Sequence, residues 1–284
     1  MKILYLGPEG TYTARAAHFY CDNCLAGGEK FELISCRNIG NLARRVEKKR
    51  EVVGVIPIEN SLEGSVNETL NLLAHEIDVK IKAELNLPIT HNLIGKAKQK
   101  LYNIDRVISH PQALAQCRQT LQKIIPGEIK TESASSTAEA VESIKNLSDN
   151  TAALGTKKAA GLHDLRIIKE NVQDREDNWT RFIVIGHSDS SEKKGNKKTS
   201  LISVPVENRP GILHEILEEF AVRDINLTKI ESRPTRRELG EYLFFIDLSG
   251  SRQKDDIKAA IQGVEKKSSY LRVLGSYPTH YVQV

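Results

Sequence analysis

Short apolar runs alternate with amphipathic stretches in the first half of the chain. Residues 3–6, 31–35 and 52–56 are apolar and rich in strand-forming side chains, so they predict strands. The stretches between them, from residue 13 and through residues 42–46, place apolar side chains at helical spacing. Strands that alternate with helices in this way predict an α/β unit.

The middle of the chain repeats this order. A strand over 107–108 precedes a helix opened by Pro111, and a strand over 128–131 precedes a second helix. The second helix starts with Ser136 and has Glu139 three residues later, which is the capping-box pattern. Two such groups predict two lobes with a cleft between them, as in periplasmic binding proteins.

Residues 79–93 join the two groups. They alternate apolar and polar positions and contain Pro88, a pattern that predicts a strand crossing from one lobe to the other. Ligands of open α/β sheets bind outside the carboxyl ends of the strands. The cleft is therefore the expected ligand site.

A change in composition ends the first unit. Residues 188–198 contain no apolar side chain and predict a solvated linker between a unit over 1–187 and a second one over 199–284. The second unit reads βαββαβ, the order of an α+β ferredoxin-like domain. Its expected strands cover 201–206, 226–232, 242–248 and 270–275. One expected helix starts at Pro210, and the other covers 255–264. So small a domain buries little surface alone, so we expect a homodimer or homotetramer.

Length and charge limit the classes of function. The 284 residues, 39% of them hydrophobic, provide material for two cores. The net charge is only +4, with acids and bases interspersed, so no basic face for nucleic acid is expected. The first apolar run is too short for a signal peptide, and no later run approaches a membrane span. We expect a cytoplasmic protein with no nucleic-acid or membrane partner.

The cysteines and histidines do not follow a metal-site pattern. Cys21 and Cys24 form a C-x-x-C pair, but Cys36 and Cys117 are isolated, so a second ligand pair is missing. Cys21 and Cys24 are instead i, i+3 neighbours that close a helix as reduced thiols. The histidines are scattered, and no carboxylate cluster has ligand spacing. We expect neither a metal nor a cofactor.

Polar and small residues gather where predicted strands lead into predicted helices. These turns cover residues 7–13, 57–66, 109–112 and 135–137. Each turn alone is explained by ordinary helix capping. Thr180-Arg181 adds a fifth polar position, where a polar loop enters an apolar strand. Because helix N-termini favour negative charge, the set predicts a site for a small, multiply anionic molecule.

Taken in order, these segments resemble prephenate dehydratase, the family that converts prephenate to phenylpyruvate in phenylalanine biosynthesis. Thr13 stands where the family commonly has serine and keeps the hydroxyl. The C-terminal unit resembles an ACT regulatory domain through residues 208–213 and through Glu231-Ser232-Arg233-Pro234. Residues 211–214 read Gly-Ile-Leu-His where the family often has Gly-Ala-Leu-Val. Within the first unit, the resemblance runs through 7–13, 57–66, 84–93, 110–117, 136–140, 152–160 and 171–182.

The resemblance implies a cofactor-free hydro-lyase. Prephenate loses carbon dioxide and its C4 hydroxyl, and the ring becomes aromatic. Thr180 is the matched residue tied to activity, and because a threonine hydroxyl is a poor acid, we expect it to donate a hydrogen bond to the leaving oxygen. Arg181 either clamps a substrate carboxylate or pairs with a local acid such as Asp174. His110 is the rival general acid, and Glu59 qualifies only if it is buried.

The expected site residues follow by matching positions. The catalytic set is Thr180, Arg181, Asn60 and Ser61. The substrate-binding set is Thr11, Gly64, Gln112, Ser136, Thr137 and Phe182, of which Phe182, with Pro111, packs the walls. The effector set for L-phenylalanine is Asn208, Pro210, Gly211, Ile212, Leu213, Glu231, Ser232 and Arg233. The family implies feedback inhibition, and activation stays open because contacts do not give the sign of an allosteric effect.

Three alternative functions stay open. An arogenate dehydratase would use a cleft carboxylate, such as Glu59, to bind the substrate's ammonium group. A non-catalytic small-anion-binding protein would share the two lobes, but the missing export signal and the appended ACT domain argue against it. A ligand-sensing regulator would need a DNA-binding segment, and the sequence contains none.

Overall fold

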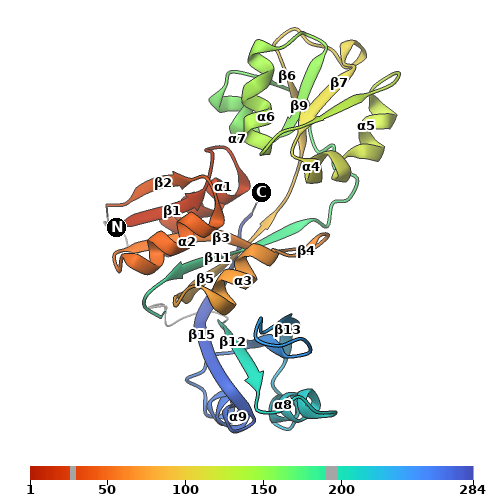
Figure 1. Ribbon diagram of the computed structural model, residues 1–284. Helices are drawn as coiled ribbons and strands as arrows, with labels where there is room; N and C mark the ends of the chain where they lie inside the picture. Colours follow the sequence, from red (N-terminus) through yellow and green to blue (C-terminus); the bar gives the residue numbers. More distant parts are fainter. Residues whose placement is uncertain (26–29, 190–196, 284) are drawn as a thin grey trace.

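The computed structural model describes residues 1–25, 30–189 and 197–283. Three parts follow one another in Figure 1, with the second lobe at the top, the first lobe in the middle and the C-terminal domain at the bottom. The predicted two-lobed α/β unit and the βαββαβ domain are both confirmed.

The first lobe is a mixed sheet with helices on both faces. Strand β1 runs parallel to β2 and β3, and β11 runs antiparallel to β3 and β5. The elements are β1 (Lys2–Leu6), α1 (Tyr12–Cys24), β2 (Glu32–Cys36), α2 (Ile39–Lys48), β3 (Val52–Asn60), β4 (Gly64–Ser65), α3 (Asn67–His75), β5 (Lys80–Pro88) and β11 (Trp179–Gly186).

Strand β3 is apolar along most of its length because both of its faces are buried. Val53 and Val55 pack toward α1, whereas Val52 and Ile56 pack toward α2 and α3. Successive side chains of a strand point to opposite faces, so a strand covered on both faces needs a nearly continuous apolar run. The apolar stretch read from the sequence over 52–56 is this doubly covered strand.

The second lobe has its own sheet, in the order β10-β6-β9-β7-β8. Its strands are β6 (Asn92–Gly95), β7 (Arg106–Ser109), β8 (Lys130–Ser133), β9 (Thr151–Gly155) and β10 (Arg166–Lys169). Its helices are η1 (Leu101–Asn103), α4 (Pro111–Gln116), α5 (Arg118–Ile124), α6 (Thr137–Ser143), η2 (Ile144–Asn146) and α7 (Lys157–Leu162).

The segment predicted as one crossing strand over 79–93 is two strands. Strand β5 belongs to the first sheet and ends at Pro88, and β6 begins the second sheet at Asn92. Pro88 lies opposite Trp179 at the end of the β5–β11 pairing. Proline has no N–H to donate, which favours the end of the ladder at this point.

The C-terminal domain packs its helices on one side of an antiparallel sheet ordered β13-β14-β12-β15. The last strand is longer than the predicted 270–275, because its end pairs in parallel with β5 and extends the sheet of the first lobe. The elements are β12 (Lys197–Pro205), α8 (Ile212–Ala221), β13 (Leu227–Pro234), β14 (Tyr242–Ser249), α9 (Asp255–Lys266) and β15 (Ser268–Tyr281).

Three local predictions need correction. The expected linker over 188–198 ends too late, because Lys197 and Lys198 already pair in β12, while residues 190–196 lie outside the described part of the chain. Pro210 precedes helix α8, which starts after Gly211 in the left-handed conformation (φ 87°). The turn over 57–66 does not lead straight into a helix, because it forms the β3–β4 hairpin first.

Candidate active site

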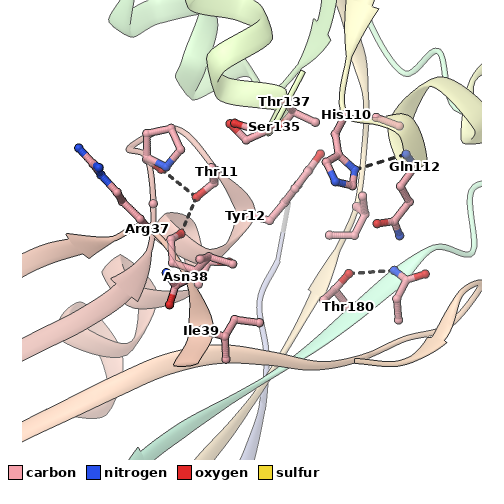
Figure 2. A pocket seen from close by; sticks show the side chains of 18 of the residues that line it. Thr11, Tyr12, Arg37, Asn38, Ile39, His110, Gln112, Ser135, Thr137 and Thr180 are labelled. Carbon is pink, nitrogen blue, oxygen red and sulfur yellow. Dashed lines mark hydrogen bonds between the residues drawn. The ribbon is translucent and has the colours of Figure 1, made fainter. Parts of the chain in front are cut away.

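A cleft of about 810 Å³ lies between the two lobes. Figure 2 shows Thr11 and Asn38 of the first lobe on one side, facing His110 and Gln112 of the second lobe on the other. Thr180 lies on the floor of this view. The cleft therefore forms at the expected place, where strands of both sheets lead into helices.

Helix N-termini border the cleft on the first lobe. Thr11 Oγ1 accepts a hydrogen bond from Ala14 N at 3.2 Å and caps α1. Asn38 Oδ1 accepts from Asn41 N at 2.8 Å and caps α2. Positive helix ends at the cleft wall favour an anionic ligand. In the second lobe, Ser136 caps α6 as predicted.

Thr180 and Asn60 form the polar centre of the floor. Asn60 ends β3 and is paired with Thr180 of β11. Asn60 Nδ2 donates to Thr180 Oγ1 at 2.9 Å. Because this bond occupies a lone pair of the hydroxyl, the hydrogen of Thr180 is available to a ligand.

Two histidines line the cleft in the neutral form. Burial lowers the pKa of His110, and its Nδ1 accepts a hydrogen bond from Gln112 N at 3.3 Å. This arrangement leaves the ring hydrogen on Nε2. Burial also lowers the pKa of His91, although a hydrogen bond to Gln116 opposes the shift. Neither ring is a charged acid near neutral pH.

Six of the ten residues expected around the substrate line the cleft, namely Thr11, Asn60, Gln112, Ser136, Thr137 and Thr180. The other expected residues lie elsewhere. Ser61 accepts from Trp179 N at 2.9 Å and donates to Asp177 O at 3.1 Å, so it holds the loop against β11. Gly64 sits in the β3–β4 hairpin with φ 81°. Phe182 is buried in the core against α1.

Arg181 does not clamp a ligand in the cleft, which corrects one of its two expected roles. Adjacent strand residues point to opposite faces, and Arg181 faces the C-terminal domain. Its Nε lies 2.6 Å from Glu84 Oε2, and an Nη lies 2.6 Å from Asp247 Oδ2. Burial alone would lower the pKa of Arg181, but the Asp247, Tyr277 and Glu84 groups raise it well above its ordinary value.

The acids proposed near the site also have structural partners. Glu59 pairs with Arg181 at 3.3 Å and with Lys229 at 3.1 Å, away from the cleft lining. Asp174 was the alternative partner for Arg181, but its carboxylate instead accepts from Gln119 N and Thr120 N. Glu59 is therefore not placed to act as an acid on a ligand.

The expected effector segments lie in the C-terminal domain, and the second one contacts the first lobe. Glu231 accepts a short hydrogen bond from the Ser65 hydroxyl of β4. Lys229 donates to the same hydroxyl at 2.7 Å. Arg233 pairs with Glu231 at 2.8 Å and donates to the Asn67 side chain at the start of α3.

Four of the other effector candidates are exposed, whereas Ile212 and Leu213 are not. Ser232 is exposed on β13, and Asn208 Nδ2 donates to Gly240 O at 3.0 Å. Pro210 and Gly211 form the turn before α8, whose first residues are Ile212 and Leu213. Ile212 is buried.

The polar cleft-lining residues that the sequence reasoning missed include Tyr12, Ser35, Arg37, Asn38, Glu68, His91 and Gln116. Arg37 and Asn38 occupy the turn between β2 and α2, which is the same kind of strand-to-helix turn as the four that were identified. Their position was the available signal. Gln116 and His91 carried no local signal, because their place depends on how the lobes pack.

Two predicted absences can be compared with the described residues. In residues 1–25, 30–189 and 197–283, no group of three or more His, Cys, Asp or Glu side chains is arranged to hold a metal ion. Within the same ranges, none of the helices has the length and apolar character needed to span a membrane. None of the four cysteines forms a disulfide within the described residues, and Cys21 and Cys24 lie on helix α1, as predicted.

Comparison with known proteins gives a consistent picture. The prephenate dehydratase family model matches residues 3–190, and the ACT domain model matches residues 200–266. The chain is 41% identical to prephenate dehydratase of Methanocaldococcus jannaschii over 97% of each chain. It is 39% identical to the bifunctional chorismate mutase/prephenate dehydratase of Aquifex aeolicus, covering 100% of this chain and 75% of that protein.

A solved structure agrees over almost the full length. Prephenate dehydratase from Arthrobacter aurescens, in complex with L-Phe, superposes with a TM-score of 0.87 at 33% identity, covering 98% of this chain and 90% of that one. The resemblance inferred from the motifs is thereby confirmed, for the cleft-bearing unit and for the C-terminal domain. This chain belongs to the prephenate dehydratase family.

Proposed function

We propose that this chain converts prephenate to phenylpyruvate, carbon dioxide and water, and that L-phenylalanine regulates it through the ACT domain. The observation that carries the catalytic part is the Thr180 hydroxyl, held by Asn60 in a cleft bordered by helix N-termini. Family membership supplies the reaction, and this cleft supplies a place for a small dianion.

The reaction needs little covalent chemistry from the protein. The bond from the ring to its carboxylate breaks, its electron pair becomes part of the aromatic ring, and the C4 oxygen leaves with a proton as water. Thr180 donates a hydrogen bond to that oxygen as negative charge develops on it. The neutral His110, with its hydrogen on Nε2, is the second donor on the cleft wall.

The cleft also has charge suited to prephenate. Arg37 is the one lysine or arginine side chain among the described residues that line it, and the N-termini of α1 and α2 add partial positive charge. The arogenate alternative relied on a carboxylate such as Glu59, which faces Arg181 and Lys229 instead. Glu68 is the carboxylate that does line the cleft, and its Oε1 accepts a hydrogen bond from Gly40 N of α2 at 3.1 Å. Arg37 and the two helix N-termini supply the positive charge for the carboxylates of prephenate, and the relative turnover of prephenate and arogenate decides between the two substrates.

Regulation by L-phenylalanine is supported by direct contacts between the expected effector segment and the first lobe. Glu231 and Lys229 both bind the Ser65 hydroxyl, and Ser65 lies in the hairpin that starts at Asn60. An effector that binds Glu231 or its neighbours competes for these contacts and so changes the energy of the hairpin. We expect feedback inhibition, a homodimer or homotetramer, and a cytoplasmic location.

The test is a phenylpyruvate assay, read by absorbance in base. Thr180→Ala is expected to reduce kcat about 10²–10³-fold, which is the typical cost of one lost transition-state donor. Thr180→Ser keeps the hydroxyl and is expected to retain most of the rate. Thr131→Ala, on the exposed edge strand β8, is the matched control. Near-normal kcat in Thr180→Ala would remove Thr180 from the mechanism, and a wild-type chain without turnover would refute the proposed reaction.

A further inference from the structure

A chain of hydrogen bonds behind the cleft has a direction that can be derived from its first member. Asn60 Oδ1 accepts from Leu62 N at 3.0 Å and from Glu63 N at 3.1 Å. Two backbone donors on one amide oxygen forbid the flipped orientation of Asn60, because the flip would place N–H groups against N–H groups. Asn60 Nδ2 must therefore face the acceptors on its other side.

The next link of the chain is Asn178. Asn60 Nδ2 donates to Asn178 Oδ1 at 2.8 Å, in addition to Thr180 Oγ1 at 2.9 Å. Trp179 O, at 3.1 Å, is a more distant third acceptor for the same amide. Since Asn178 accepts through its oxygen, its Nδ2 faces the opposite way and donates to Gln116 Oε1 at 2.9 Å.

The last link is His91. Its Nε2 lies 3.2 Å from Gln116 Oε1, the same oxygen that accepts from Asn178. An oxygen can bind this ring nitrogen only if Nε2 carries the hydrogen, so His91 must be the Nε2–H tautomer with Nδ1 bare. His91 Nδ1 is buried and has no hydrogen-bond partner in the described residues, in agreement with a nitrogen that has nothing to donate.

Asn178 joins groups from both lobes although it does not line the cleft. Asn178 is 1% exposed, and its backbone carbonyl accepts a hydrogen bond from Ile89 N, in the crossover between the lobes, at 2.9 Å. Gln116 belongs to α4 of the second lobe, whereas Asn60 and Thr180 belong to the sheet of the first lobe. The amide of Asn178 can satisfy both neighbours only when α4 is seated against the first lobe.

We propose that Asn178 is a positioning residue, which aligns Asn60 and the Thr180 hydroxyl with helix α4 of the opposite lobe through this one-directional chain. The proposal rests on the proposed dehydratase function for its effect on rate. It acts through Asn60 and makes no contact with substrate. Removing its amide leaves Asn60 Nδ2 with Thr180 Oγ1 and the more distant Trp179 O, and leaves Gln116 Oε1 with His91 Nε2 alone, so Asn60 is no longer tied to α4.

The first experiment uses the full chain and two substitutions. Asn178→Leu removes both links, and we expect kcat to fall about 10–100-fold with KM changed less than about threefold, because a lost buried hydrogen bond costs that factor and Asn178 itself does not line the cleft. Asn178→Asp keeps the acceptor for Asn60 but loses the donor to Gln116. Gln122→Glu, exposed on α5, adds the same charge near the lobe and is expected to behave as wild type.

The second experiment tests the direction of this chain of hydrogen bonds without measuring turnover. Ring ¹⁵N chemical shifts of His91, assigned by comparison with His91→Gln, are expected to give the Nε2–H tautomer in the wild type. In Asn178→Asp, Gln116 must turn its amide to donate to the new carboxylate, so the Nε2–H tautomer is expected to be lost. Gln122→Glu is expected to retain it.

Each outcome decides the proposal. An Nδ1–H tautomer in the wild type, or retention of the Nε2–H tautomer in Asn178→Asp, overturns the direction of the chain of hydrogen bonds. A kcat within about twofold of wild type in folded Asn178→Leu overturns the positioning role. If Asn178→Leu does not fold, the wild-type and Asn178→Asp spectra still decide. If the wild type does not turn over prephenate, the proposed reaction is wrong. The spectra still test the direction of the hydrogen bonds from Asn60 to His91, because they do not depend on turnover.

Discussion

Replacement of Arg181 by methionine tests whether this side chain supports the fold or binds the substrate. The guanidinium side chain is 9% exposed and joins Glu84, at 0%, to Asp247, at 6%. Methionine keeps much of the side-chain length and removes the charge. In our interpretation, the substitution leaves the cleft lining intact and breaks a buried ionic link between the first lobe and the C-terminal domain.

The size of the effect follows from the partners that remain. Without Arg181, Glu84 keeps its ion pair with Lys198 at 2.7 Å. Among the described side chains, the Asp247 carboxylate then keeps only the Ser200 hydroxyl and Tyr277 as partners. Loss of one partner from a buried ion pair costs about 3–5 kcal/mol. At about 2–4 °C per kcal/mol for a chain of this size, Tm is expected to fall by roughly 6–20 °C.

The assay combines thermal unfolding with prephenate kinetics at a temperature where the variant is folded. Arg175→Met is the matched control, because Arg175 forms an exposed pair with Asp177. Its Tm is expected to stay within about 1–2 °C of wild type, as is usual for surface pairs. Addition of Asp247→Leu to Arg181→Met is expected to recover stability, since no uncompensated carboxylate then remains at that position. A Tm within about 2 °C of wild type with KM raised more than about tenfold would refute our reasoning and restore Arg181 as a substrate clamp.

Three further predictions concern the histidines, the regulatory contact and the first-lobe core. Burial lowers the pKa of His91, so the unfolded chain binds a proton at this ring more readily than the folded chain does. The contribution of neutral His91 to stability is therefore fully present above about pH 6.5 and is lost as the pH falls toward the pKa of the folded state. Tm should drop from pH 7 to pH 5, and the drop should be smaller in His91→Gln. An equal drop in both proteins would contradict the lowered pKa of His91. Ser65→Ala removes the hydroxyl that binds Glu231, and the L-phenylalanine response of the assay should weaken about fivefold or more, whereas an unchanged response would exclude this contact from the coupling. Gly54→Ala would place a Cβ 2.5 Å from Leu42 Cδ2, and chemical unfolding should show a loss of about 1–3 kcal/mol; full stability would mean that α2 can shift without cost.

The sequence alone was sufficient for features set by local patterns. The apolar run over 52–56, the capping serine Ser136 and the βαββαβ order all appear in the structure at the predicted places. Their signals are local, because strand and helix periods and N-terminal caps depend on residues a few positions apart. The same holds for Thr180, whose place at the mouth of an apolar strand was visible in the sequence.

The tertiary structure decided which face of a strand meets which part of the protein. Alternation shows that Thr180 and Arg181 point in opposite directions, but both faces of β11 are covered, so the sequence does not say which one is the cleft. The same uncertainty applied to Phe182, which packs against α1. Arg181 is buried between the first lobe and the C-terminal domain, where its ion pairs give it a structural role. No local pattern in the sequence predicts this burial.

Contacts between distant segments were also decided only by the fold. Asn178, Gln116 and His91 come from three separate segments of the chain, and nothing near any of them indicates the other two. The return of β15 to pair with β5 likewise depends on where the C-terminal domain sits. Hydrogen bonds and strand pairs over such separations depend on register and lobe packing, which the local preferences of the chain do not specify.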